Sequence, residues 1–168
     1  MERPEFYRFH QGDRVLPFAA SEYNARLAGL RRIMQDAGIT ACVLTSMHSI
    51  AYYSGFLYCS FGRPYGLVVT MSDSVTISAG IDAAQPWRRC HGDNITYTDW
   101  QRDNYWRAIA SVTGSGASIG IEGDHLTLVQ REKLDTFLAP KAVIDAAPLA
   151  MAQRMHKSAA ELDLIRHG

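Results

Sequence analysis

The stretch YGLVVTMSDSVTISA, residues 65–79, decides the fold class. Its two apolar runs, residues 65–71 and 75–79, flank the turn-forming triplet Ser72-Asp73-Ser74 and therefore predict a β-hairpin, whose strands are antiparallel. On both sides of this hairpin, short strand patterns alternate with helix patterns, which is typical of an α/β domain. The sequence thus predicts an α/β fold with a mixed β-sheet flanked by helices.

Upstream of the hairpin, the sequence predicts a helix, a buried strand and a short second helix. The first helix begins at Ser21, a suitable N-cap, and ends at Gly38, with Arg26 on its water-facing side. The strand covers residues 40–45, and the second helix runs from residue 47 to 53 before Gly55. Residues 1–18 are polar and irregular, so we expect an N-terminal arm there.

Downstream of the hairpin, strands and helices continue to alternate. The predicted elements are a helix from Asp82 to Cys90, a strand at 95–98, a helix at 104–112, a strand at 118–122, a helix from Thr127 to Leu138, a strand at 142–145 and a segment at 148–155. Ser158 and Glu161 then form a capping box for a helix that reaches Gly168. We expect three parts: an arm at 1–18, a domain at 19–155, and at 156–168 the start of a connector helix to a further, catalytic domain.

Composition narrows the functional classes. Seventeen basic residues balance seventeen acidic ones, so no overall field favours nucleic acid or an anionic membrane. No apolar run approaches the roughly 20 residues that a membrane-spanning helix needs. Three widely spaced cysteines indicate free thiols rather than a disulfide framework. We therefore expect a cytoplasmic protein without nucleic-acid or membrane partners.

Familiar catalytic patterns are missing from the sequence. The six histidines show no His-Glu-x-x-His spacing, no Cys-x-x-Cys pair suits zinc, and no phosphate-binding loop or nucleophile elbow is present. Asp124-His125 comes nearest to an acid/base or metal pair, but adjacent residues at a helix start do not face one ion. We therefore interpret this pair as a helix-capping Asp beside an exposed His.

The segment SGFLYCSFGRPYG, residues 54–66, is the strongest candidate for a binding site. Within it, Phe61 and Arg63 flank Gly62, which lets the backbone turn, and Pro64 fixes the exit direction. An arginine held in this way suits a bidentate carboxylate clamp, and a neighbouring phenylalanine offers an apolar wall and a π face for a cation. Together they fit a small zwitterion with a carboxylate and a guanidinium or amine.

Two structural alternatives compete with this interpretation of the loop. Its aromatic side chains, from Phe56 to Tyr65, can fold back into the core. Arg63 can also form an ion pair inside its own domain, with Asp82 or Asp99 as the partner.

Four motifs resemble the N-terminal domain of the creatinase family. They are SIAYYS at 49–54, FLYCSFGRPY at 56–65, QPWRR at 85–89 and YTDWQRDNY at 97–105. The final segment, MHKSAAE at 155–161 through IRHG at 165–168, resembles the connector found throughout the creatinase/prolidase (pita-bread) superfamily. The second and fourth motifs are the most specific, and the resemblance extends over nearly the whole chain after about residue 10. Ala51 departs from the Asn that the family pattern leads us to expect.

This resemblance implies a function that composition does not show. Creatinases are homodimers that hydrolyse creatine to sarcosine and urea without a metal or other cofactor, through a histidine in the C-terminal domain. The N-terminal domain of one subunit covers its partner's active site, and an aromatic and an arginine from its loop touch the substrate. Motif by motif, these two residues are Phe61 and Arg63 here. Neither would be catalytic, and residues 1–168 alone would be inactive.

The sequence leaves two alternatives to the creatinase assignment open. The chain is also compatible with the N-terminal domain of a prolidase- or aminopeptidase P-like metallopeptidase, or with a free-standing binding or dimerisation module. Within the creatinase reading, creatine or a related guanidino acid are both compatible substrates.

Overall fold

The computed structural model describes residues 3–57, 62–82 and 84–167 of the 168-residue chain. Its strands are β1 (Phe6–Arg8), β2 (Ala41–Leu44), β3 (Gly66–Thr70), β4 (Ser74–Ala79), β5 (Asp93–Tyr97), β6 (Ser118–Ile121) and β7 (Ala142–Asp145). Its helices are α1 (Ala20–Asp36), α2 (Met47–Ser54), α3 (Ala84–Arg89), the 3-10 helix η1 (Trp100–Arg102), α4 (Asn104–Thr113), α5 (Leu128–Leu138), α6 (Ala147–Met155) and α7 (Ala159–His167). The predicted α/β class is confirmed.

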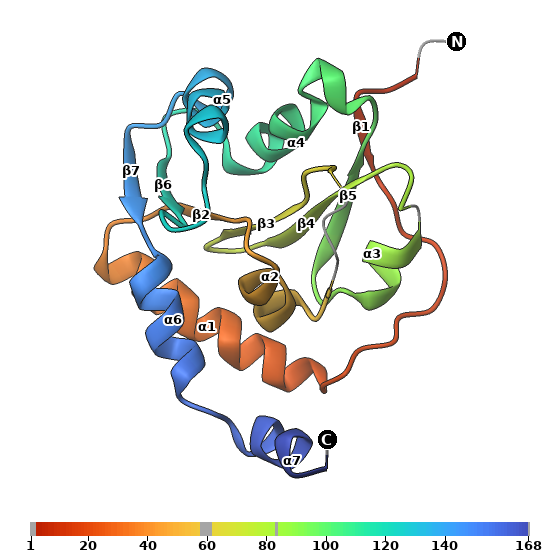
Figure 1. Ribbon diagram of the computed structural model, residues 1–168, viewed down its shortest axis with the longest axis vertical. Coiled ribbons are helices and arrows are strands. Elements are labelled where there is room, and N and C mark those ends of the chain that lie inside the picture. The colour runs from red at the N-terminus through yellow and green to blue at the C-terminus, as the bar shows by residue number, and fades with distance from the viewer. Residues whose placement is uncertain (1–2, 58–61, 83, 168) are drawn as a thin grey trace.

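The described strands form one seven-stranded mixed sheet in the order β1-β5-β4-β3-β2-β6-β7 (Figure 1). The predicted hairpin is β3–β4, with Val68 opposite Val75, and β3 is also antiparallel to β2. The pairs β4–β5, β2–β6 and β6–β7 are parallel. All strands except β1 and β3 therefore run in one direction, and their carboxyl ends lie at the same edge of the sheet.

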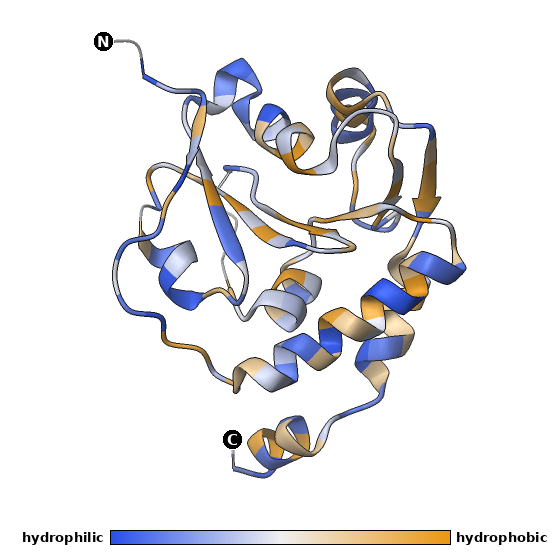
Figure 2. Ribbon diagram, turned by 180° about the vertical axis from the view of Figure 1, so that it is seen from behind, coloured by the Kyte–Doolittle hydropathy of each residue, from blue (hydrophilic) through white to orange (hydrophobic). Residues whose placement is uncertain are grey.

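Helices cover both faces of this sheet and enclose two apolar cores. Helices α4 and α5 pack on one face, where alternate strand residues such as Val43, Val68 and Ile77 are buried. Helices α1, α2 and α6 cover the other face, where Leu44 and Leu67 are buried. Figure 2 shows orange stretches on the central strands and a mixture of orange and blue residues along the helices that cover them. Successive side chains of a strand point to opposite faces and so enter the two cores in turn, which leaves β2 and β4 buried along their whole length.

Most predicted elements are confirmed, including the helix ends. Gly38 and Gly55 both have positive φ, +68° and +84°, and end α1 and α2 as expected. The Thr127–Gln130 capping box opens α5 with both reciprocal hydrogen bonds present. At α7, the backbone N–H groups of Ser158 and Glu161 each donate to the other residue's side chain, which confirms the last capping box.

Three expectations about the N-terminal part are wrong. Phe6–Arg8 are not irregular but form β1, an edge strand antiparallel to β5; three residues are too few to show alternation in the sequence. Helix α1 begins one residue before Ser21, after Ala19, whose side chain makes no capping hydrogen bond. Arg26 does not face water: its side chain is only 5% exposed, because groups from α2 and α7 surround it.

Candidate functional site

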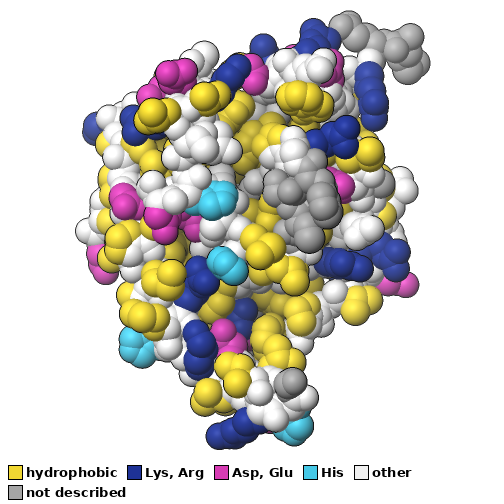
Figure 3. Space-filling view, in the orientation of Figure 1, with side chains coloured by type: hydrophobic (Ala, Val, Ile, Leu, Met, Phe, Trp, Pro, Cys, Tyr) yellow, Lys and Arg dark blue, Asp and Glu magenta, His cyan; other side chains and the backbone are white. Residues whose placement is uncertain are grey.

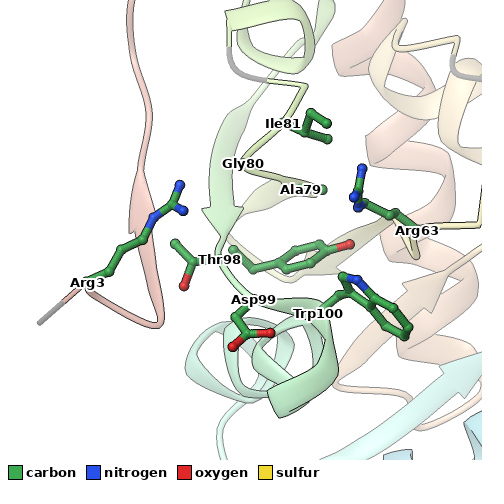
Figure 4. A pocket seen from close by; sticks show the side chains of 9 residues that line it. Arg3, Arg63, Ala79, Gly80, Ile81, Thr98, Asp99 and Trp100 are labelled. Carbon is green, nitrogen blue, oxygen red and sulfur yellow. The ribbon is translucent and has the colours of Figure 1, made fainter.

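The shared carboxyl edge of the strands holds a cavity of about 210 Å³. Ligands bind preferentially beyond the carboxyl ends of strands in open α/β sheets. Residues after β4 and β5, the loop before β3 and the N-terminal segment line this cavity: Arg3, Arg63, Ala79, Gly80, Ile81, Tyr97, Thr98, Asp99 and Trp100 (Figure 4). The structure thus places Arg63, predicted as a binding residue, in the wall of a cavity.

The backbone around Arg63 is held by β5 and α4. Tyr97 donates a hydrogen bond of 2.6 Å from its hydroxyl to the carbonyl of Pro64, and the buried Tyr105 hydroxyl donates to the carbonyl of Tyr65 at 3.3 Å. Gly62 has φ +82°, a left-handed conformation that glycine adopts without strain. The turn and the anchored exit expected for this loop are both present.

The structure distinguishes the loop residues that pack in the core from the one that lines the cavity. Phe56 and Tyr65 are buried, 2% and 7% exposed, and their rings meet edge to face at 6.1 Å, so these aromatics belong to the core. Phe61, the second predicted binding residue, lies outside the described residues. Among the residues that the structure describes, no ion pair joins Arg63 to Asp82 or Asp99. Figure 4 shows the Arg63 guanidinium on the Ala79–Ile81 side of the cavity, with the Asp99 carboxylate directed away from it.

Trp100 also lines the cavity, and the sequence analysis did not predict it as a site residue. Its side chain is 48% exposed although it is large and apolar, and Figure 4 shows it beside Arg63. It begins η1, a short turn flanked by Asp99 and Asp103, which have φ +32° and +60°. Non-glycine residues with positive φ are uncommon and concentrate at functional sites. The signal available in the sequence was the motif YTDWQRDNY, which contains the whole turn.

The residues that line this cavity suit the binding of a ligand rather than catalysis. A half-buried guanidinium suits a carboxylate, and an exposed indole ring suits an apolar or cationic group. Among its described lining residues there is no histidine or cysteine, and the Thr98 hydroxyl is occupied by donation to the carbonyl of Pro4 at 2.7 Å. These residues can position a small zwitterion, whereas an activated nucleophile is missing among them.

The described cysteines are not reactive groups. Cys42 and Cys90 are both free and fully buried. Burial, with a smaller contribution from the charge of Glu122, raises the pKa of the Cys42 thiol to about 12. Burial also raises the pKa of the Cys90 thiol. A protonated, buried thiol is a poor nucleophile and metal ligand.

The Asp124-His125 pair has no joint role in the structure. His125 Nδ1 instead lies 2.9 Å from the hydroxyl of Thr45, at the end of β2. The neighbouring Glu122 is buried and accepts hydrogen bonds from the backbone N–H groups of Thr45 and Ser46, both at 2.7 Å. This carboxylate therefore stabilises the start of α2. Within the described ranges, no three His, Cys, Asp or Glu side chains cluster to hold a metal ion.

Comparison with known proteins identifies the family to which this chain belongs. The model of the Creatinase/Prolidase N-terminal domain matches residues 26–156, most of the chain. The chain belongs to the creatinase/prolidase N-terminal domain family. It is also 45% identical over 162 residues to a creatinase from Bacillus sp. (strain B-0618), an alignment that covers 94% of this chain and 39% of that protein. The chain thus spans about two fifths of the length of this curated relative.

Solved structures of the creatinase/prolidase family share the fold. A proline dipeptidase from Streptococcus pneumoniae TIGR4 superposes with a TM-score of 0.70 at 16% identity, over 78% of this chain and 98% of that chain. An Xaa-Pro dipeptidase from Bacillus anthracis also gives a TM-score of 0.70, at 17% identity over 84% and 38%. At these identities the likeness shows the fold alone.

None of the helices in the described part of the chain combines the length and the hydropathy needed to cross a bilayer.

Proposed function

We propose that this chain is the N-terminal, substrate-covering domain of a creatinase-type hydrolase that converts creatine to sarcosine and urea. In this proposal the chemistry belongs to a catalytic domain that follows the connector helix α7, and the functional unit is a homodimer. The 45% identity to the Bacillus creatinase is the observation that carries the proposal. The cavity at the sheet edge, with Arg63 in its wall, is compatible with it.

Arg63 has a defined role in this proposal. Its guanidinium binds the carboxylate of creatine and fixes the orientation of the substrate, which lowers the entropic barrier to reaction. Phe61 packs against the substrate and excludes water. Neither residue takes part in proton transfer, so residues 1–168 alone should release no urea from creatine.

A hybrid enzyme tests the role of Arg63. In it, this chain replaces the matching N-terminal part of the Bacillus creatinase, and urea release is measured against creatine concentration. Arg63→Ala should raise KM about 10- to 100-fold, the loss expected for a charge-assisted hydrogen bond, with a smaller effect on kcat. Arg32→Ala, at an exposed position on α1, is the matched control and should leave both constants unchanged. An unchanged KM in Arg63→Ala, or an inactive hybrid with the unaltered chain, would count against the proposal.

The 45% identity to the Bacillus creatinase also favours creatine over a dipeptide as substrate. The solved dipeptidases share only the fold with this chain, at 16–17% identity. A prolidase-like activity remains the second outcome of the substrate test and would appear as cleavage of Xaa-Pro dipeptides that depends on added Mn²⁺ or Co²⁺.

A further inference from the structure

Trp100 is a large apolar side chain that stands half-exposed in the wall of the Arg63 cavity. It is 48% exposed and lines the cavity of about 210 Å³ together with Arg63. Exposure alone assigns no function, because hydrophobic side chains are common on protein surfaces, and Figure 3 shows many of them among the charged groups on one face of this molecule. Trp100 differs from an ordinary surface residue in how its backbone is held and in what shares its cavity.

The backbone on both sides of Trp100 is held in a fixed turn. Asp99 and Asp103, on either side of η1, both have positive φ, which is uncommon for residues other than glycine. The backbone N–H of Asp103 donates to the carbonyl of Trp100 at 3.2 Å and closes the turn. Lys133 of α5 pairs with the Asp103 carboxylate at 2.5 Å. The turn therefore presents the indole ring to the cavity in a defined position.

The face of this indole ring is open to a ligand. In the described part of the chain an arginine covers the ring of Trp87, with the guanidinium carbon of Arg14 at 3.6 Å, but none lies over Trp100. Figure 4 shows Trp100 beside Arg63 in the same cavity. Because the cavity is small, a molecule that is held by the Arg63 guanidinium also meets the indole ring.

The chemistry of creatine decides which of its groups meets Trp100. In the proposed function, on which this step rests, Arg63 holds the carboxylate of creatine. The substituted nitrogen of creatine carries two further groups, the apolar N-methyl group and the guanidinium carbon that water attacks. The guanidinium carbon has to face the catalytic domain, because the reacting groups belong there. The N-methyl group is then left to face the wall that this chain provides.

We propose that Trp100 is a specificity-determining residue that contacts the N-methyl group of creatine. It has the largest side chain among the described residues of the cavity wall, so it offers the N-methyl group the most apolar surface. A single methyl or methylene group in an apolar pocket changes kcat/KM by about 10- to 200-fold, and a half-exposed ring belongs at the lower end of this range. The substrate class is therefore the N-methylated guanidino acids, in preference to unmethylated ones.

Creatine and guanidinoacetate, its analogue without the methyl group, test this role in the full-length protein that carries this chain. Each reaction consumes one water and releases urea, with sarcosine as the second product from creatine and glycine from guanidinoacetate. The unaltered protein should have the higher kcat/KM for creatine, and Trp100→Ala should lower the ratio of the two values about tenfold. Trp100→Phe keeps an aromatic wall and should retain most of the preference. A loss of folded protein lowers both values equally and leaves their ratio unchanged.

Ile81→Ala is the matched control inside the same cavity. This side chain also lines the cavity but is 69% exposed, so its removal should change the ratio much less than Trp100→Ala does. Three results would overturn the role of Trp100 and leave the proposed function standing: no preference for creatine in an active unaltered protein, an unchanged ratio in Trp100→Ala, or an equally large change in Ile81→Ala. A full-length protein that releases urea from neither substrate would instead overturn the proposed function, and the role of Trp100 with it.

Discussion

Arg26 and Arg63 show how differently the same side chain is used in one domain. Arg26 is enclosed by two carboxylates, a backbone carbonyl and aromatic rings, so its main effect is to join helices α1, α2 and α7. Arg63 stands in a cavity wall on an anchored loop, without an ion pair to the carboxylates predicted as its alternative partners. A buried arginine of the first kind stabilises the fold, whereas one of the second kind is available to a ligand.

His91 should make the stability of the domain depend on pH. Its ring stacks on Tyr23 at 5.3 Å, and its Nε2 lies 2.8 Å from Asn24 Oδ1. Burial, and then the charge of Arg14, lower the pKa of His91 below its ordinary value of 6.5. The unfolded chain therefore binds a proton more readily, so this contribution to stability is present above about pH 6.5 and is lost as the pH falls through the lower pKa of the folded state.

Urea unfolding at several pH values measures this effect. Between pH 7 and 5, the free energy of unfolding should fall less steeply in His91→Gln than in the unaltered chain, because the exchanged side chain does not titrate. Equal slopes for the two proteins would show that His91 does not contribute.

Cys42 and Cys90 should be protected from thiol reagents in the folded domain. Both side chains are 0% exposed and their thiols have raised pKa values, so the reactive thiolate is scarce. After brief iodoacetamide treatment, mass spectrometry should find these two residues modified only when the chain has been unfolded in urea. Rapid modification of either in the native chain would contradict the described packing.

At the scale of elements, Glu122 connects β6 to the start of α2. Its carboxylate accepts from the N–H groups of Thr45 and Ser46 and from the Ser46 hydroxyl at 2.5 Å. Glu122→Ala leaves the buried N–H of Thr45 unsatisfied, at a cost of about 1–3 kcal/mol, whereas water can partly replace the carboxylate at the two partly buried donors of Ser46; we therefore expect a loss of about 2–4 kcal/mol in the free energy of unfolding. Glu132→Ala, at an exposed position on α5, should change it by less than about 0.5 kcal/mol. Equal effects in urea denaturation would refute this role for Glu122.

Local patterns were sufficient to predict most of the elements. Helix ends at Gly38 and Gly55, the hairpin around Ser72–Ser74 and the box at Thr127 depend on residues only a few positions apart, so the sequence shows them directly. Features that depend on distant contacts were missed. Strand β1 exists because Phe6–Arg8 pair with β5, far along the chain.

The candidate site was predicted only in part, because some of its residues are brought there by distant contacts. Gly62 and Pro64 marked the turn that presents Arg63, and that prediction needed only neighbouring residues. Trp100 enters the cavity because β4 and β5 are parallel neighbours and because Asp99 adopts positive φ, neither of which a local pattern shows. The burial of Arg26 likewise requires Tyr52 and Glu161, 26 or more positions away.

At the scale of the whole molecule, strand direction places the Arg63 cavity. Five strands end at one edge of the sheet, so the Arg63 cavity and the start of α2 lie on the same side of the domain. Helix α7, which begins at Ala159, lies apart from the sheet, below α1 and α6 in Figure 1. In the proposed function, this arrangement presents one edge of the sheet to the substrate and leaves α7 at the periphery.

The most direct test of the account is the substrate of the full-length protein that carries this chain. Purified protein is incubated with creatine and, separately, with Xaa-Pro dipeptides, each with and without added Mn²⁺ or Co²⁺. Urea should be released from creatine without added metal, and the dipeptides should stay intact. Cleavage of the dipeptides that requires the metal, with no urea from creatine, would contradict it.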